Sequence, residues 1–92
     1  MHFRVRWPDG SATRCYSPSL VIKDYLTPGA SYPIAEFVER SRLALIVASE
    51  RVREKYGFQC RHAQHQREEI EAIGARFADM PEARVTVEAF EA

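Results

Sequence analysis

Hydrophobic and polar residues alternate through the first sixteen positions of the chain. In HFRVRW, residues 2–7, every second side chain is apolar, which is the period of a strand with one buried face. The PDG that follows predicts a three-residue hairpin loop, because Pro8 fixes φ for a type I turn and Gly10 suits the left-handed position that closes the loop. This loop length sets the register of the hairpin, in which Phe3 faces Cys15, Val5 faces Thr13 and Arg4 faces Arg14.

The segment ARVTVEAFE, residues 83–91, alternates in the same way. A strand here that pairs with the first one adds its apolar residues to the same core and brings Glu88 near the like-charged arginine pair. The hairpin and this segment together predict a three-stranded antiparallel sheet. An uninterrupted alternation puts Val85, Val87 and Ala89 on one face and Thr86, Glu88 and Phe90 on the other.

Between the strands the hydrophobic period becomes helical. Ser17 followed by Pro18 is typical of a helix N-cap and first turn, so SPSLVIKDYL, residues 17–26, predicts a short helix. We expect TPGASYP, residues 27–33, to be a loop. Apolar residues at 100° intervals then predict a long helix over residues 33–56, which Gly57 ends.

A third helix is predicted from about residue 61 to residue 77, because Ala63, Ile70, Ile73 and Phe77 form a narrow apolar stripe there. The chain is therefore expected to be one α+β domain, residues 1–92, with the element order ββαααβ. The long central helix should cross one face of the small sheet. A chain of this length has room for one hydrophobic core.

Composition changes this picture little. Thirteen basic residues balance thirteen acidic ones, so no overall field favours a nucleic acid or an anionic membrane. No apolar run approaches the ~20 residues of a membrane span, and Arg4 and Arg6 interrupt the region where a secretory signal would be apolar. We therefore expect a cytoplasmic protein in which Cys15 and Cys60 are thiols.

The segment CRHAQH, residues 60–65, is the densest group of potential metal ligands. On one helix, His62 and His65 lie 60° apart, but Cys60 lies about 140–160° from both, so one metal cannot be reached by all three. A zinc site would need Cys60 in the preceding turn and a fourth ligand such as Cys15, and the spacing matches no structural zinc pattern. We expect no metal and no cofactor. Cys60 has two interpretations: a reactive thiol at a helix N-terminus, or the favoured one, a small buried side chain.

Two surfaces are candidates for binding. Arg4, Arg6 and Arg14 form a basic sheet face that could bind nucleic acid, although a solvated polar face is the more common interpretation and nucleic acid stays the minor alternative. On the long helix, LALIVA is apolar around its whole circumference. Its far side must be covered by another helix of the chain, at even odds, or by a partner protein or second copy. The partner-interface candidates are Leu43, Ile46 and Val47.

Several stretches together resemble one family. CYSPSLVIKDYL, SYPIAEFVERSR, ASERVREKYGFQC and the opening RVRWPDG are similar to small nitrogen-starvation-response proteins, which are encoded in bacterial gene clusters that also carry a nitrilase. The resemblance runs from residue 1 to about residue 60 and rests on long stretches in order. The region of His62 and His65 matches more loosely, so these histidines inherit no role.

The resemblance implies a physiological context: nitrogen limitation and the use of nitrile or cyanide nitrogen, alongside a radical-SAM protein, an acetyltransferase-like protein and a flavoprotein-like oxidoreductase. It transfers no catalytic residue. Many family-like positions start or stop helices, but five lack a full structural explanation and are our ligand-binding candidates: Asp24, Tyr25, Tyr32, Arg40 and Arg42.

The resulting hypothesis is a non-catalytic accessory or regulatory protein that associates with a protein partner or with itself. The competing hypothesis is a small enzyme or ligand-binding module that uses the loop from Asp24 to Tyr32.

Overall fold

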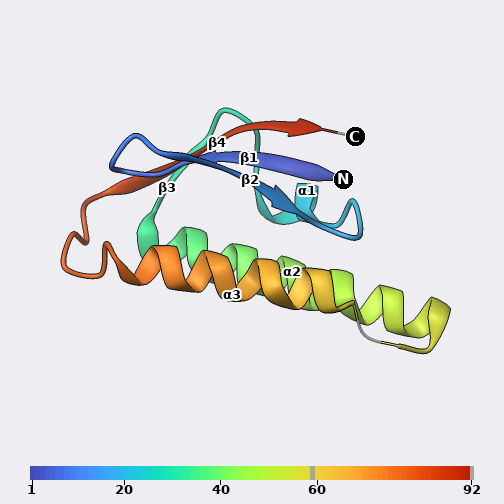
Figure 1. Ribbon diagram of the computed structural model, residues 1–92. Helices are drawn as coiled ribbons and strands as arrows, with labels where there is room; N and C mark the ends of the chain where they lie inside the picture. The colour runs from blue at the N-terminus through green and yellow to red at the C-terminus, as the bar shows by residue number, and fades with distance from the viewer. Residues whose placement is uncertain (59, 92) are drawn as a thin grey trace.

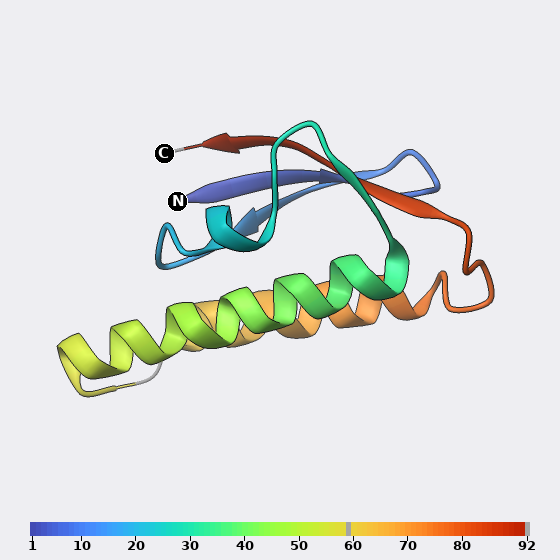
Figure 2. The same cartoon turned by 180° about the vertical axis from the view of Figure 1, so that it is seen from behind.

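The computed structural model describes residues 1–58 and 60–91, which form a layer of two long helices beneath a twisted antiparallel sheet (Figures 1 and 2). A short third helix, α1, lies between these layers at one end. The elements along the chain are β1 (His2–Arg6), β2 (Ala12–Tyr16), α1 (Ile22–Tyr25), β3 (Ser31–Pro33), α2 (Ile34–Tyr56), α3 (Arg61–Ala75) and β4 (Arg84–Glu91).

The register of the N-terminal hairpin is as predicted. β1 and β2 pair antiparallel with Phe3 opposite Cys15, Val5 opposite Thr13 and Arg4 opposite Arg14. The loop is closed by hydrogen bonds from the Trp7 N–H to the Ser11 carbonyl at 2.8 Å and from the Gly10 N–H to the Trp7 carbonyl at 2.9 Å. Gly10 has a φ of 88°, the left-handed conformation that the three-residue loop requires.

The prediction of three strands is wrong, because the described residues form a four-stranded sheet in the order β2-β1-β4-β3. The additional strand, β3, lies in the segment that was expected to be a loop. It pairs antiparallel with β4, with Tyr32 opposite Val85. The element order is therefore ββαβααβ. Pro33 ends β3 at the sheet edge, where a residue without an N–H is tolerated.

The helix expected over residues 17–26 is reduced to the single turn α1. Ser17 does not cap it, because its backbone continues the hairpin, with its N–H donating to the Met1 carbonyl at 3.0 Å. The Ser17 hydroxyl donates instead to the Ser19 carbonyl at 2.7 Å. Pro18 therefore lies in an irregular turn after a strand. A serine followed by a proline fits such a turn as well as it fits the start of a helix. This ambiguity explains why a helix was predicted to start at Ser17.

A bulge in β4 overturns the expected faces of its last residues. Arg4 pairs with Ala89 whereas the next residue, Val5, pairs with Val87, so one step on β1 spans two steps on β4. Beyond the bulge the alternation is inverted. Ala89 is exposed, and Phe90 packs against the core with its ring edge-to-face on Phe3.

The long helices follow their predicted patterns. α2 ends at Gly57, whose φ of 79° is left-handed and whose N–H donates to the Arg53 carbonyl at 2.8 Å. α3 buries Ala63, Ile70 and Gly74 against the rest of the fold. Among the helices of residues 1–58 and 60–91, none combines the length and apolar character needed to cross a membrane.

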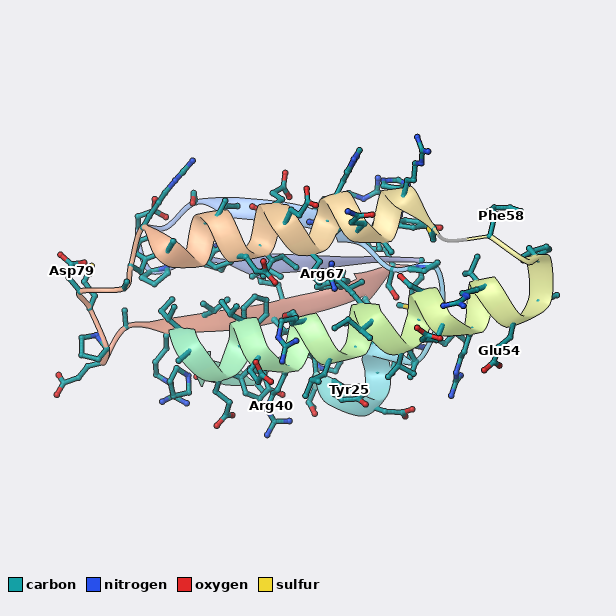
Figure 3. All side chains as sticks on the ribbon, turned by 90° about the horizontal axis from the view of Figure 1, so that it is seen from below. Tyr25, Arg40, Glu54, Phe58, Arg67 and Asp79 are labelled. Carbon is teal, nitrogen blue, oxygen red and sulfur yellow. The ribbon has the colours of Figure 1, made fainter. Side chains whose placement is uncertain are left out.

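One hydrophobic core fills the space between the sheet and the helices. Trp7 is at its centre: its ring lies edge-on to Phe37 of α2 at 5.5 Å and stacks on Phe77 at 6.3 Å. The indole N–H donates to the Thr13 hydroxyl at 3.0 Å, so this buried donor has a partner. The sheet is thereby fixed over α2, and the outer sides of both long helices are left to face solvent (Figure 3).

Candidate functional site

Three of the five ligand-binding candidates come together beside α1. Arg40 donates hydrogen bonds to the Tyr25 carbonyl at 3.0 Å and to the Glu36 carboxylate at 3.1 Å, and its guanidinium lies 5.0 Å from the centre of the Tyr32 ring. The Tyr32 hydroxyl accepts a hydrogen bond from the Thr27 N–H at 3.0 Å. Figure 3 shows Tyr25 and Arg40 on the same flank of α2. These contacts fasten α1 and the following loop to α2.

The other two candidates lie apart from this group. Asp24 is exposed on α1. Arg42 makes a two-point ion pair with Glu39, at 3.1 Å and 2.6 Å, and this hydrogen bonding lowers the pKa of Glu39 below its ordinary value. None of the three hollows described in the structure is lined by a ligand-binding candidate from the loop Asp24 to Tyr32. Ligand binding by these residues stays a prediction.

The far side of α2 is covered only in part. α3 packs along one flank of α2 and α1 packs against another, which leaves Ile46 and Val47 half-buried. Leu43, with 40% of its surface exposed, is the most accessible of the three partner-interface candidates. Cover by another helix of the chain and cover by a partner were expected at even odds, and each fits part of this surface. The chain covers the edges of the apolar group and leaves its centre in contact with solvent.

The basic sheet face is largely neutralised by β4. Glu88 was predicted to lie near the arginines, and it pairs with Arg6 at 3.3 Å. Glu91 pairs with Arg14 at 2.7 Å. The Arg6 guanidinium also donates to the Gly10 carbonyl at 2.7 Å. Two of the three arginines thus have anionic partners within the chain, which weakens the attraction of this face for a phosphate backbone.

An aromatic stack at the open end of the sheet escaped the sequence analysis. The ring of His62 at the start of α3 lies flat on the ring of Tyr16, with centroids 4.0 Å apart and planes 7° apart. His2 meets the same tyrosine edge-on at 5.6 Å. The Tyr16 N–H donates to the Gln66 side chain at 2.9 Å. The histidine that matched the family only loosely therefore contributes to docking α3 on β2.

The pKa of His2 is expected to lie below its ordinary value of 6.5. Removal of water around the ring is the largest cause, followed by the positive charges of Arg14 and the Met1 ammonium; Glu91 opposes the shift, and His62 adds to it. The folded state then binds this proton more weakly than the unfolded state does. Stability from this group is present above the ordinary pKa of 6.5 and is lost as the pH falls through the lower pKa of the folded state.

An NMR titration of the His2 ring should place its midpoint below 6.5, and His2→Gln should reduce the loss of stability between about pH 7.5 and pH 5.5. His65, which is exposed on α3, is the matched histidine for the same substitution. A midpoint for His2 above 6.5 would contradict the prediction.

The two cysteines differ in environment, and both are free. Cys15 is fully buried beneath the sheet, and burial raises the pKa of its thiol to about 12. Cys60 is half-buried at the start of α3. Within residues 1–58 and 60–91, no three or more His, Cys, Asp and Glu residues are grouped in a way that could hold a metal ion.

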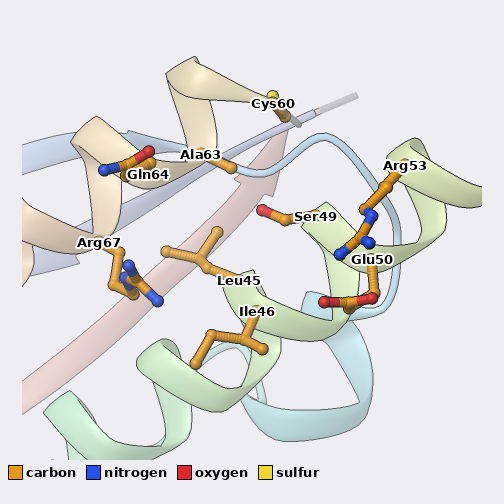
Figure 4. Close-up of a pocket in the computed structure, with 9 residues that line it drawn as sticks. All are labelled: Leu45, Ile46, Ser49, Glu50, Arg53, Cys60, Ala63, Gln64 and Arg67. Atoms are coloured by element: carbon orange, nitrogen blue, oxygen red, sulfur yellow. The ribbon is translucent and has the colours of Figure 1, made fainter. Parts of the chain in front are cut away.

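A hollow of about 120 Å³ lies between α2 and the first half of α3, and the sequence analysis did not find it (Figure 4). Its apolar wall includes Leu45 and Ala63, and Ser49 and Cys60 line it between the two helices. Arg53 and Arg67 lie at opposite ends, one on each helix; the other lining residues are Ile46, Glu50 and Gln64. The available signal was the set of small side chains, serine, alanine and cysteine, on facing helical positions.

Comparison with known proteins identifies the chain through its sequence. A family model described as nitrogen starvation-induced protein NitG matches residues 2–90, which extend from the start of β1 almost to the end of β4. No curated protein matches the chain, and no solved structure does. The resemblance to nitrogen-starvation proteins is thereby confirmed over nearly the whole sequence, including α3. The chain belongs to the NitG family of nitrogen starvation-induced proteins.

Proposed function

We propose that this protein is a non-catalytic accessory or regulatory component of the nitrogen-starvation response that acts in the cytoplasm by binding another protein or a second copy of itself. The family supports the physiological part of this proposal. The use of nitrile or cyanide nitrogen is the metabolic setting that we propose for it.

The partial exposure of Leu43 on the outer side of α2 is the observation that carries the proposal. An apolar side chain that is surrounded by half-buried apolar neighbours and then by charges has the arrangement of a small interface centre within a polar rim. Here the half-buried neighbours are Ile46 and Val47. We name these three residues the α2 outer patch.

Charged groups next to the α2 outer patch are held in place by local ion pairs. Arg42 pairs with Glu39, and Arg40 pairs with Glu36, in each case within one turn of the helix. Such exposed pairs add little stability, so their main effect is on the charge pattern that a partner meets. A rim of this kind favours one orientation of the partner over others.

The proposal predicts that Leu43→Glu abolishes association. A carboxylate at the centre of the patch would lose its water on binding without gaining a partner, which costs several kcal/mol and lowers affinity by at least about a hundredfold. The mass of the purified protein in solution detects self-association. Affinity purification from nitrogen-starved cells, with the bound proteins identified by mass spectrometry, detects a different partner.

Leu20→Glu is the matched control, because Leu20 is more exposed than Leu43 and lies before α1, outside the α2 outer patch. It should leave association unchanged. If the wild-type protein is monomeric and retains the same proteins as the Leu43→Glu variant, the patch has no role in binding and the proposal fails.

A further inference from the structure

We propose that the hollow between α2 and α3 is a binding site for a short-chain monocarboxylate of two or three carbon atoms. It adjoins the α2 outer patch and shares Ile46 with it, but Leu43, the residue that carries the first proposal, does not line it. Failure of one proposal therefore leaves the other intact.

Two arginines, Arg53 and Arg67, give the hollow its positive charge. Arg67 is half-buried, and no ion pair involves Arg67 or Arg53 in the part of the chain that the structure describes. By contrast, the other half-buried arginine, Arg42, is paired with Glu39. A guanidinium that has lost part of its hydration is stabilised when an anion takes the place of the lost water. Figure 4 shows Arg67 pointing toward the space beside Leu45 and Ile46.

The nature of the anion follows from the remaining lining groups. A planar carboxylate matches the fork of a guanidinium, and the Ser49 hydroxyl is a further donor on the wall. Glu50 also lines the hollow, so the two arginines are opposed by one carboxylate and the net charge favours a monoanion over a dianion. The apolar wall formed by Leu45 and Ala63 suits a short alkyl end.

Size sets the limit on chain length. A volume of about 120 Å³ corresponds to roughly four water molecules, at about 30 Å³ each. A ligand of about four to six non-hydrogen atoms fills such a space. This matches acetate or propionate, whereas a drug-sized molecule would extend out of the hollow into solvent.

Cys60 provides a direct reporter, because it is one of the residues that line the hollow. Alkylation of Cys60 by neutral iodoacetamide should slow as acetate fills the site, by about tenfold at ten times Kd, since only the empty fraction reacts. Cys15 does not interfere, because it is buried and its pKa is raised to about 12. Acetamide, which has the shape of acetate without the charge, should give no protection.

Arg67→Gln should remove the protection, and Arg61→Gln should keep it, because Arg61 lies next to Cys60 on α3 without lining this hollow. Arg53→Gln is the second test from the opposite helix, and circular dichroism confirms that each variant is folded. Amide shifts of Ser49 and Ala63 on titration with acetate locate the bound ligand independently.

Saturable protection by acetate that Arg67→Gln abolishes supports the site. Three results overturn it: equal protection by acetamide, equal protection by sodium chloride or inorganic phosphate at matched ionic strength, or unchanged protection in the Arg67→Gln variant.

Discussion

Trp7→Ala should lower the free energy of unfolding by about 3–5 kcal/mol, the largest effect that we expect from any single substitution in this fold. Trp7 is 2% exposed, and its ring contacts Phe37 of α2 and Phe77 in the turn after α3. A domain of this length has about 5–14 kcal/mol in total, so this substitution removes a large share of its stability. Urea unfolding followed by circular dichroism measures the loss, because Trp7 is the only tryptophan and its fluorescence disappears with it.

Two conservative variants separate the ring from its hydrogen bond. Trp7→Phe keeps an aromatic ring in the core and should cost less than the alanine variant. Thr13→Val leaves the ring in place and removes the acceptor of the indole N–H, which should cost about 1 kcal/mol. A loss below about 1 kcal/mol for Trp7→Ala would contradict the central position that the structure gives this residue.

Gly74→Val should destabilise the protein by about 3 kcal/mol through overpacking between α2 and α3. A Cβ atom at Gly74 would lie 2.6 Å from Cγ2 of Val38, far inside contact distance. Val38 is β-branched and cannot easily turn its methyl group away, because its rotamers in a helix are restricted. The helices must then separate, or the core must shift. Thermal and urea unfolding measure the cost.

Ala72→Val is the matched control, since Ala72 is exposed on the same helix two residues earlier. It should cost about 0.5 kcal/mol, the difference in helix propensity alone. Combining Gly74→Val with Val38→Ala should recover part of the lost stability. If both valine variants cost the same, the close approach of the two helices at Gly74 does not limit packing.

The fold was predictable where local chemistry leaves one solution. The proline and glycine of the first turn determine the hairpin register, and Gly57 determines the end of the long helix. The errors arise where two structures share one pattern. A serine and a proline fit both a helix start and a turn, whereas β3 is too short, at three residues, to show an alternation. The sequence does not indicate the bulge in β4, because valine, glutamate and alanine fit either face of a strand.

The candidate residues were harder to interpret because their contacts join distant parts of the chain. Arg40 reaches the carbonyl of Tyr25 across fifteen residues, and only the folded chain shows that this contact is structural. His62 was judged by its helical angle to other ligands, which correctly argued against a shared metal but could not show that its ring would meet Tyr16. The hollow depends on the spacing between two helices, which no single segment encodes.

The central position of β4 in the sheet has a consequence for synthesis. β4 is translated after every other element described here, yet it lies between β1 and β3 and carries Val85 and Val87 into the core. A nascent chain that stops before residue 84 therefore has a hairpin with an unpaired edge, and its helices are only partly covered by the sheet. Folding of this unit must wait until β4 has emerged from the ribosome, so it completes as a late, cooperative event rather than in stages along the growing chain.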